Sequence, residues 1–170
     1  MAYADTLSGT AQVKLGMKVT TTDGKVEGVK NLTFDLVKSY ADGTGSAQAT
    51  GFFDATFTAT TGGITLSLAS ADPLGAAGDD TWTSTAEGAK LRVLVIENQD
   101  ASNYVSLKKG TNGDTNIFSG ATDSIRIDAG GIFLWVSPAG SNAMSDGADD
   151  ELIVTSNSAS VVCRIAYVFG

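Results

Sequence analysis

The residues with the clearest capacity for chemistry form an acidic segment, SDGADDE, at Ser145–Glu151. It places four carboxylates around a glycine, those of Asp146, Asp149, Asp150 and Glu151. Oxygen-rich turns of this kind suit Ca²⁺, although the spacing does not match an EF-hand loop. Because acidic side chains are almost always solvated, we expect an exposed turn here. Calcium at these four residues is the weaker alternative, and no other metal or cofactor is predicted.

Catalysis finds little support among the remaining residues. The chain holds no histidine, which removes the usual general base and the usual serine and cysteine triads. No acidic residue lies in an evidently apolar segment beside a second one, as a pair of glycosidase carboxylates requires. The single cysteine, Cys163, lies in an apolar run with no visible activating partner, so we expect a buried, unreactive thiol. The sequence predicts a protein that is not an enzyme.

The charge balance argues against nucleic acid as a partner. The chain has 11 basic and 19 acidic residues, a net charge of −8, and nucleic-acid binding relies on clustered Lys and Arg. The glycine-rich segment 42–51 lacks the lysine of a phosphate-binding loop. No apolar run approaches the length of a membrane span, and the first residues show no signal-peptide pattern. We expect a protein made in the cytoplasm without membrane contact.

The sequence predicts that short strands joined by turns of small residues hold the acidic segment and Cys163 in place. Twenty glycines, a charged fraction of 18% and a hydrophobic fraction of 42% suit such a chain. The central strand is predicted at Lys90–Asp100 (KLRVLVIENQD), where apolar and β-branched residues occur on both faces. We expect Ala101–Gly110 to turn back as its partner strand.

Other segments alternate with the period of a strand. Residues 52–61 and 64–69 are separated by Gly62-Gly63, which predicts a hairpin. A last hairpin is expected to pair Glu151–Ser156 with Ser160–Phe169. Residues 11–21 predict a half-buried strand, and residues 41–51 a long surface loop. The segment 25–40 is ambiguous: we favour a strand in its second half, with a helix at 32–39 as the alternative.

The fold class that follows is all-β, an antiparallel β-sandwich of jelly-roll or related type with about ten strands. Residues 1–10 predict an extended N-terminal arm, and residues 11–170 a single sandwich domain. A change of composition at 71–89 divides that domain into two subregions, 11–70 and 90–170.

Several short motifs follow one another in a fixed order between residues 91 and 170. They are VLVIEN (93–98), Tyr104-Val105, the I-x-I strand at 125–127, GGIFLWVSP (130–138) and a terminal hairpin. Together with SYADGTGSAQAT (39–50), this pattern resembles small β-sandwich structural proteins of tailed bacteriophage virions.

The resemblance implies a virion component, most simply a capsid decoration or cement protein that stabilises the shell through protein–protein contacts. Its partners would be the major capsid protein or other virion proteins, and a homo-oligomer, with a trimer as one form, is expected. One alternative is a carbohydrate- or receptor-binding fibre module that uses Trp82, Tyr104 or the acidic segment. Another is a tail-tube or head–tail adaptor subunit that joins neighbours by strand addition.

Overall fold

The computed structural model describes residues 9–20, 29–42, 45–46, 48–70, 74, 88–113, 117–118, 120, 122–145, 149–158 and 160–170. In these ranges the chain forms eleven strands and no helix, and so none that could cross a membrane. The strands are β1 (Gly9–Thr20), β2 (Val29–Asp42), β3 (Gln48–Ala49), β4 (Gly51–Ala59), β5 (Ile64–Ser67), β6 (Leu91–Asn98), β7 (Val105–Lys109), β8 (Ser124–Ile127), β9 (Ile132–Val136), β10 (Glu151–Ser156) and β11 (Val161–Phe169).

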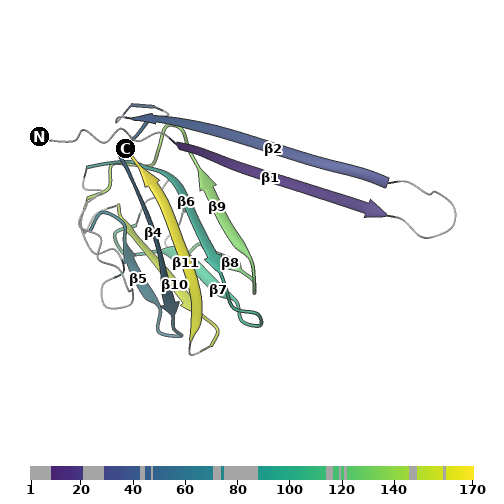
Figure 1. The fold of residues 1–170 in the computed structure, drawn as a ribbon. Helices are drawn as coiled ribbons and strands as arrows, with labels where there is room; N and C mark the ends of the chain where they lie inside the picture. The colour runs from purple at the N-terminus through teal and green to yellow at the C-terminus, as the bar shows by residue number, and fades with distance from the viewer. Residues whose placement is uncertain are drawn as a thin grey trace, which may run out of the picture.

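Eight strands make two antiparallel sheets that pack face to face (Figure 1). The first sheet has the order β4-β11-β6-β9, and the second has the order β5-β10-β7-β8. A single core cluster joins them, with Leu94 and Ile165 from the first sheet and Leu107 and Val154 from the second, all fully buried. The predicted all-β, antiparallel sandwich is confirmed.

The predicted central strand is an interior strand of the first sheet. β6 lies between β11 and β9, and six of its eight residues are buried. In β11 every second residue is buried, from Val161 through Cys163, Ile165 and Tyr167 to Phe169. Strict alternation in β11 and near-continuous burial in β6 match the patterns read from the sequence.

The three predicted hairpins are wrong, because each pair of consecutive strands is divided between the two sheets. β4 pairs with β11 and β5 with β10, so Gly62-Gly63 carries the chain across the core. β7 pairs with β10 and β8 instead of β6, and β10 does not pair with β11. A short glycine-containing turn can connect strands of two different sheets as well as two paired strands. The alternation of apolar and polar residues shows which side chains face the core, but not which strand is the hydrogen-bonded neighbour.

These crossings also connect the two expected subregions. β4 and β5 find their partners in β11 and β10, about a hundred residues further on. Leu74, from the expected connection at 71–89, is buried in the common core. The described strands β4 to β11 therefore share one sandwich.

β1 and β2 form a long two-stranded ribbon outside the sandwich. They pair without interruption from Gly9 opposite Tyr40 to Thr20 opposite Val29. The ribbon leaves the sandwich near the C-terminus and extends away from both sheets (Figure 1). The helical alternative for 32–39 is wrong, since this segment is an uninterrupted part of β2.

Two expected boundaries shift at the root of the ribbon. Gly9 and Thr10 are paired residues of β1, so the predicted arm is too long by two residues, and residues 1–8 lie outside the described part. The predicted surface loop 41–51 is in part regular structure, because β3 pairs in parallel with the end of β2, Ala41 opposite Gln48. The segment has few apolar residues, but pairing of its backbone N–H and C=O groups with β2 is enough to make it a strand.

A buried arginine ties the root of the ribbon to the sandwich. Arg92 in β6 is only 1% exposed. Its guanidinium donates to the main-chain oxygens of Gly45 (2.9 Å), Pro138 (3.0 Å) and Gly170 (2.9 Å). Because Gly45 lies between β2 and β3, this one side chain joins the ribbon root, the β9–β10 connection and the end of β11.

Candidate functional site

Four connections between the sheets meet at the end of the sandwich opposite the ribbon. They lie between β4 and β5, β6 and β7, β8 and β9, and β10 and β11; we call this the loop end. Main-chain hydrogen bonds link them: Gly130 N donates to Asp100 O (3.0 Å), and Ser156 N donates to Thr60 O (3.0 Å). The loop end is therefore a connected surface.

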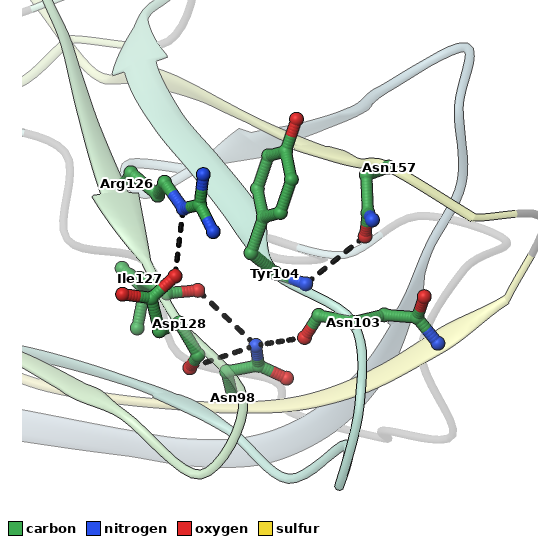
Figure 2. A network of polar contacts seen from close by, with 7 residues as sticks. All are labelled: Asn98, Asn103, Tyr104, Arg126, Ile127, Asp128 and Asn157. Carbon is green, nitrogen blue, oxygen red and sulfur yellow. Dashed lines mark hydrogen bonds and ion pairs between the residues drawn. The ribbon is translucent and has the colours of Figure 1, made fainter.

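Asn98, the last residue of β6, is fully buried beneath this surface. Figure 2 shows its amide nitrogen Nδ2 facing the main-chain oxygens of Asn103 (2.8 Å), Ile127 (3.2 Å) and Asp128 (3.0 Å). Its Oδ1 accepts a hydrogen bond from Asp100 N at 3.0 Å. A side-chain amide both donates and accepts, so Asn98 holds the β6–β7 and β8–β9 connections together.

Asp100 organises the β6–β7 connection from the outside. Its Oδ1 accepts hydrogen bonds from the main-chain nitrogens of Ser102 and Asn103, both at 2.7 Å. These donors favour the ionised carboxylate and lower the pKa of Asp100 below its usual value, the bond from Ser102 contributing most.

This shift gives a pH dependence that can be measured. Because the folded-state pKa is lowered, the stabilisation by Asp100 is complete above the unfolded-state value, 3.8, and is lost as the pH falls through the folded-state value. We expect Asp100→Ala to lower the free energy of unfolding at pH 7 and to have a smaller effect at pH 2. Denaturant titrations of both proteins at the two pH values measure this difference. An equal effect at both pH values would contradict the role of the ionised carboxylate.

The exposed part of the loop end carries an ordered group of an aromatic ring, a cation and a carboxylate. The guanidinium carbon of Arg126 lies 3.9 Å from the centre of the Tyr104 ring. Its Nε donates to Asp128 Oδ1 at 2.6 Å, and these two side chains are 61% and 72% exposed. Tyr104 N also donates to Asn157 Oδ1 at 3.0 Å (Figure 2). Such a group suits hydrogen bonding and stacking against another molecule.

The acidic segment lies at the other end of the sandwich, and its residues have different environments. Asp146 is outside the described part; Asp149 has a φ of 59°. Asp150 is 1% exposed, and Glu151 begins β10, where its Oε2 accepts from Asn112 N at 3.1 Å. Among the described residues no three His, Cys, Asp or Glu side chains form a metal-binding group.

The expectation of an exposed turn is wrong at Asp150, which is 1% exposed. Its main-chain nitrogen donates to Asn112 O (2.9 Å), and its main-chain oxygen accepts from Leu68 N (3.0 Å). These two bonds fix the residue between the end of β5 and the turn after β7, which is why it is buried.

The aromatic and acidic residues considered for ligand binding do not form one site. Tyr104 precedes β7 at the loop end, whereas Glu151 lies at the opposite end of the neighbouring strand β10. Trp135 packs against the core cluster, and Trp82 lies outside the described part.

Cys163 is fully buried in β11, as expected. Burial, and to a smaller extent the negative charge of Asp100, raises the pKa of the thiol to about 11. The neutral thiol therefore persists throughout the physiological range, and it is a poor nucleophile.

We expect Cys163 to resist alkylation by iodoacetamide at pH 8 in the folded protein. It should react completely in denaturant, and mass spectrometry measures both states. Rapid labelling of the folded protein would contradict this burial.

A second surface of interest is the outer face of the sheet β4-β11-β6-β9. Seven apolar residues lie side by side on it, at the ribbon end of all four strands. We call them the outer patch: Phe52, Val93, Val95, Leu134, Val136, Ala166 and Val168. Phe52 is 52% exposed and Leu134 is 37% exposed, whereas Val93 is buried together with Ala49 of β3 and the other four are half-buried. Ile132, 63% exposed, lies on the same face in the next row, opposite Glu97.

Sequence reasoning missed Asn98, Arg92 and the outer patch as functional features. The signal for the first two was a polar residue inside a strongly apolar strand. The signal for the patch was that β6 and β9 have apolar residues on both of their faces, as strands that are buried on both faces do.

Comparison with known proteins gave no match: neither a protein-family model nor a curated protein sequence matches the chain significantly.

Proposed function

We propose that this protein is a virion structural protein, a capsid decoration or cement protein that acts through protein–protein contacts. The observation that carries the proposal is the ribbon, in which twelve residues of β1 are paired with β2 outside the sandwich. A two-stranded ribbon is marginally stable in water, so a ribbon of this length is best explained as a contact element that lies on other subunits.

The arrangement of the sandwich supports the same proposal. We infer a jelly-roll topology from the strand orders β4-β11-β6-β9 and β5-β10-β7-β8, in which every connection from β4 to β11 except β7–β8 crosses between the sheets. Jelly rolls are frequent in viral capsid proteins and in lectins. This support is an analogy of fold, because one fold serves many functions. The resemblance of residues 91–170 to phage structural proteins points toward the virion.

The proposed mechanism is cohesion by many modest contacts. The sandwich supplies a rigid body, and the ribbon extends its reach across neighbouring subunits of the shell. When several contacts act on one particle, each additional contact forms at a high effective concentration. The assembled shell is then more stable than expected from the affinity of any single contact.

Purified particles provide the test. We expect the protein to remain with virions through density-gradient purification, at a copy number comparable to that of the major shell protein. Leu15→Asp, in the ribbon, should lower the amount bound to particles. Val162→Asp is the control outside the ribbon, because Val162 is an exposed residue of β11 in the sandwich. Absence of the wild-type protein from particles would overturn the proposal.

A tail-tube or head–tail adaptor subunit is the second candidate. It is favoured by one observation, the position of β1 at the edge of the sheet β1-β2-β3, where an incoming strand could pair. Copy number separates the two, since an adaptor occurs in one ring for each particle. Glycan binding by a protein absent from virions would instead support the fibre module.

A further inference from the structure

β9 is an edge strand of the first sheet. The order β4-β11-β6-β9 places it at one end of that sheet, and β6 is its single partner among the described strands. Figure 1 shows β9 at the right-hand margin of the sandwich. An edge strand has one row of main-chain N–H and C=O groups that its own sheet does not use.

The hydrogen bonds to β6 identify the residues of β9 that carry this free row. At the start of the pairing, Asn98 N donates to Gly131 O at 2.9 Å. In an antiparallel pair, positions that bond to the neighbouring strand alternate with positions that do not. It follows that Ile132, Leu134 and Val136 direct their main-chain groups away from β6, toward the edge.

The side chains of the same three residues are all apolar and lie on the outer face of the sheet. Ile132 is 63% exposed and Leu134 is 37% exposed. The alternate residues, Phe133 and Trp135, face inward and pack against the core cluster. The free edge of the first sheet is therefore an uncharged strand with exposed apolar side chains.

The other three edge strands of the sandwich, β4, β5 and β8, have polar side chains on their exposed face. β4 has Asp54, which makes an ion pair with Arg164, and β8 has Arg126, which makes an ion pair with Asp128. β5 has the exposed Thr65. Charged and polar side chains on an edge strand oppose pairing with another chain. Within the described sandwich, β9 is the edge strand that lacks this protection.

The edge of β9 is complementary to itself. When a second copy is turned about a twofold axis that passes beside Leu134, the two Leu134 residues lie opposite each other, and Ile132 of each copy lies opposite Val136 of the other. All of these residues direct main-chain groups to the edge, so each one exchanges both of its hydrogen bonds with its partner. Their side chains share one face, where apolar cross-strand pairs stabilise a sheet.

The composition of β9 also favours a second copy as the partner. A strand added at this edge must be uncharged where it faces Ile132 and Leu134, because a charge held against apolar side chains loses hydration. A second β9 meets this requirement over its whole length, IFLWV. Although each chain has a net charge of −8, the two paired strands bring no charges together.

We propose that two copies of this chain pair through β9 in antiparallel orientation, so that their two four-stranded sheets become one continuous sheet across a twofold axis. Two short strands bury less surface than a typical stable complex, and the dimer should therefore dissociate on dilution. The contact concerns this chain alone and does not depend on a role in virions.

Leu134→Cys tests the register directly. The axis places the two residues 134 in a hydrogen-bonded pair with a Cα separation of about 5.5 Å, which suits a disulfide. We expect this variant to form a covalent dimer under mild oxidation. The native Cys163 is buried and does not compete.

Ile132→Cys is the matched control, because residue 132 is more exposed than residue 134. In the proposed register the two residues 132 lie four positions apart along the strands, roughly 14 Å, which is too far for a disulfide. We expect roughly a tenth or less of the covalent dimer that Leu134→Cys forms. Mixing Ile132→Cys protein with Val136→Cys protein should restore the crosslink, since these two positions face each other.

Sedimentation velocity gives the second readout. In a dilution series we expect the wild-type protein to change from dimer to monomer. Leu134→Lys should be monomeric, because it places two like charges against each other at the axis, with circular dichroism unchanged. Val162→Lys should still dimerise, since Val162 is 49% exposed on the interior strand β11.

Two results would overturn this pairing. One is a wild-type protein that is monomeric at every concentration, which would leave the edge of β9 to a strand of another protein. The other is as much covalent dimer from Ile132→Cys alone as from Leu134→Cys. Neither result bears on whether the protein is bound to virions, which the particle test measures separately.

Discussion

Asn98→Ala should lower the free energy of unfolding by about 3 kcal/mol, because it removes four hydrogen bonds of a fully buried side chain at once. The main-chain oxygens of Asn103 and Ile127 would lose the Asn98 donor, that of Asp128 would keep only its bond from Gly131 N, and Asp100 N would lose its acceptor. The cavity left by the amide adds to the cost. Equilibrium unfolding in urea, followed by tryptophan fluorescence, measures the change.

Asn157→Ala is the matched control in the same network. Asn157 is exposed and accepts a single hydrogen bond, from Tyr104 N, so the expected loss is below about 1 kcal/mol. Similar losses for the two variants would show that Asn98 does not hold the connections of the loop end together.

Arg92→Met should have an effect of comparable size, about 3 to 4 kcal/mol. Methionine fills part of the space, but it cannot donate to the main-chain oxygens of Gly45, Pro138 and Gly170. Hydrogen bonds from a charged donor contribute more than neutral ones. Each of the three oxygens would keep only its second donor, Gln48 N at Gly45, Ser46 Oγ at Pro138 and Lys90 N at Gly170. Differential scanning calorimetry measures the loss.

The same variant should also loosen the root of the ribbon. Hydrogen exchange at Gln48 and Ala49 of β3 should become faster than in the wild-type protein, because Gly45 is no longer tied to β6. Arg164→Met is the control, since Arg164 lies in the same sheet but makes an exposed ion pair with Asp54, so its loss should change stability far less than the loss of Arg92. If hydrogen exchange at Gln48 and Ala49 is the same in Arg92→Met as in the wild-type protein, Arg92 does not hold β3 against the sandwich.

Local patterns predicted the strands well and their partners poorly. The burial of alternate residues in β11, the interior position of β6 and the buried Cys163 all follow from side-chain period and apolar content, which are local properties. Whether β4 pairs with β5 or with β11 depends on contacts about a hundred residues apart, which no turn sequence encodes. The crossings of the sandwich were therefore misread as hairpins.

The candidate site was harder to predict, because it consists of groups that the fold brings together. Arg126 and Tyr104 are twenty-two residues apart in the sequence, and their contact depends on the pairing of β7 with β8. Asp150 is buried through main-chain bonds to Leu68 and Asn112, although its sequence neighbours are acidic and small. In both cases the deciding interaction is between distant segments.

The crossings between sheets have a kinetic consequence. β11 lies between β4 and β6 in the first sheet, so that sheet cannot assemble until residues 161–169 have left the ribosome. Most pairings join segments far apart in the chain, and such topologies fold in milliseconds to seconds, because long loops must close before contacts form. During that interval the edges of β4 and β6 are unprotected. Before β10 and β11 emerge, the described pairs whose two strands are both complete are β1–β2, β7–β8 and β6–β9, with the short β2–β3 pairing.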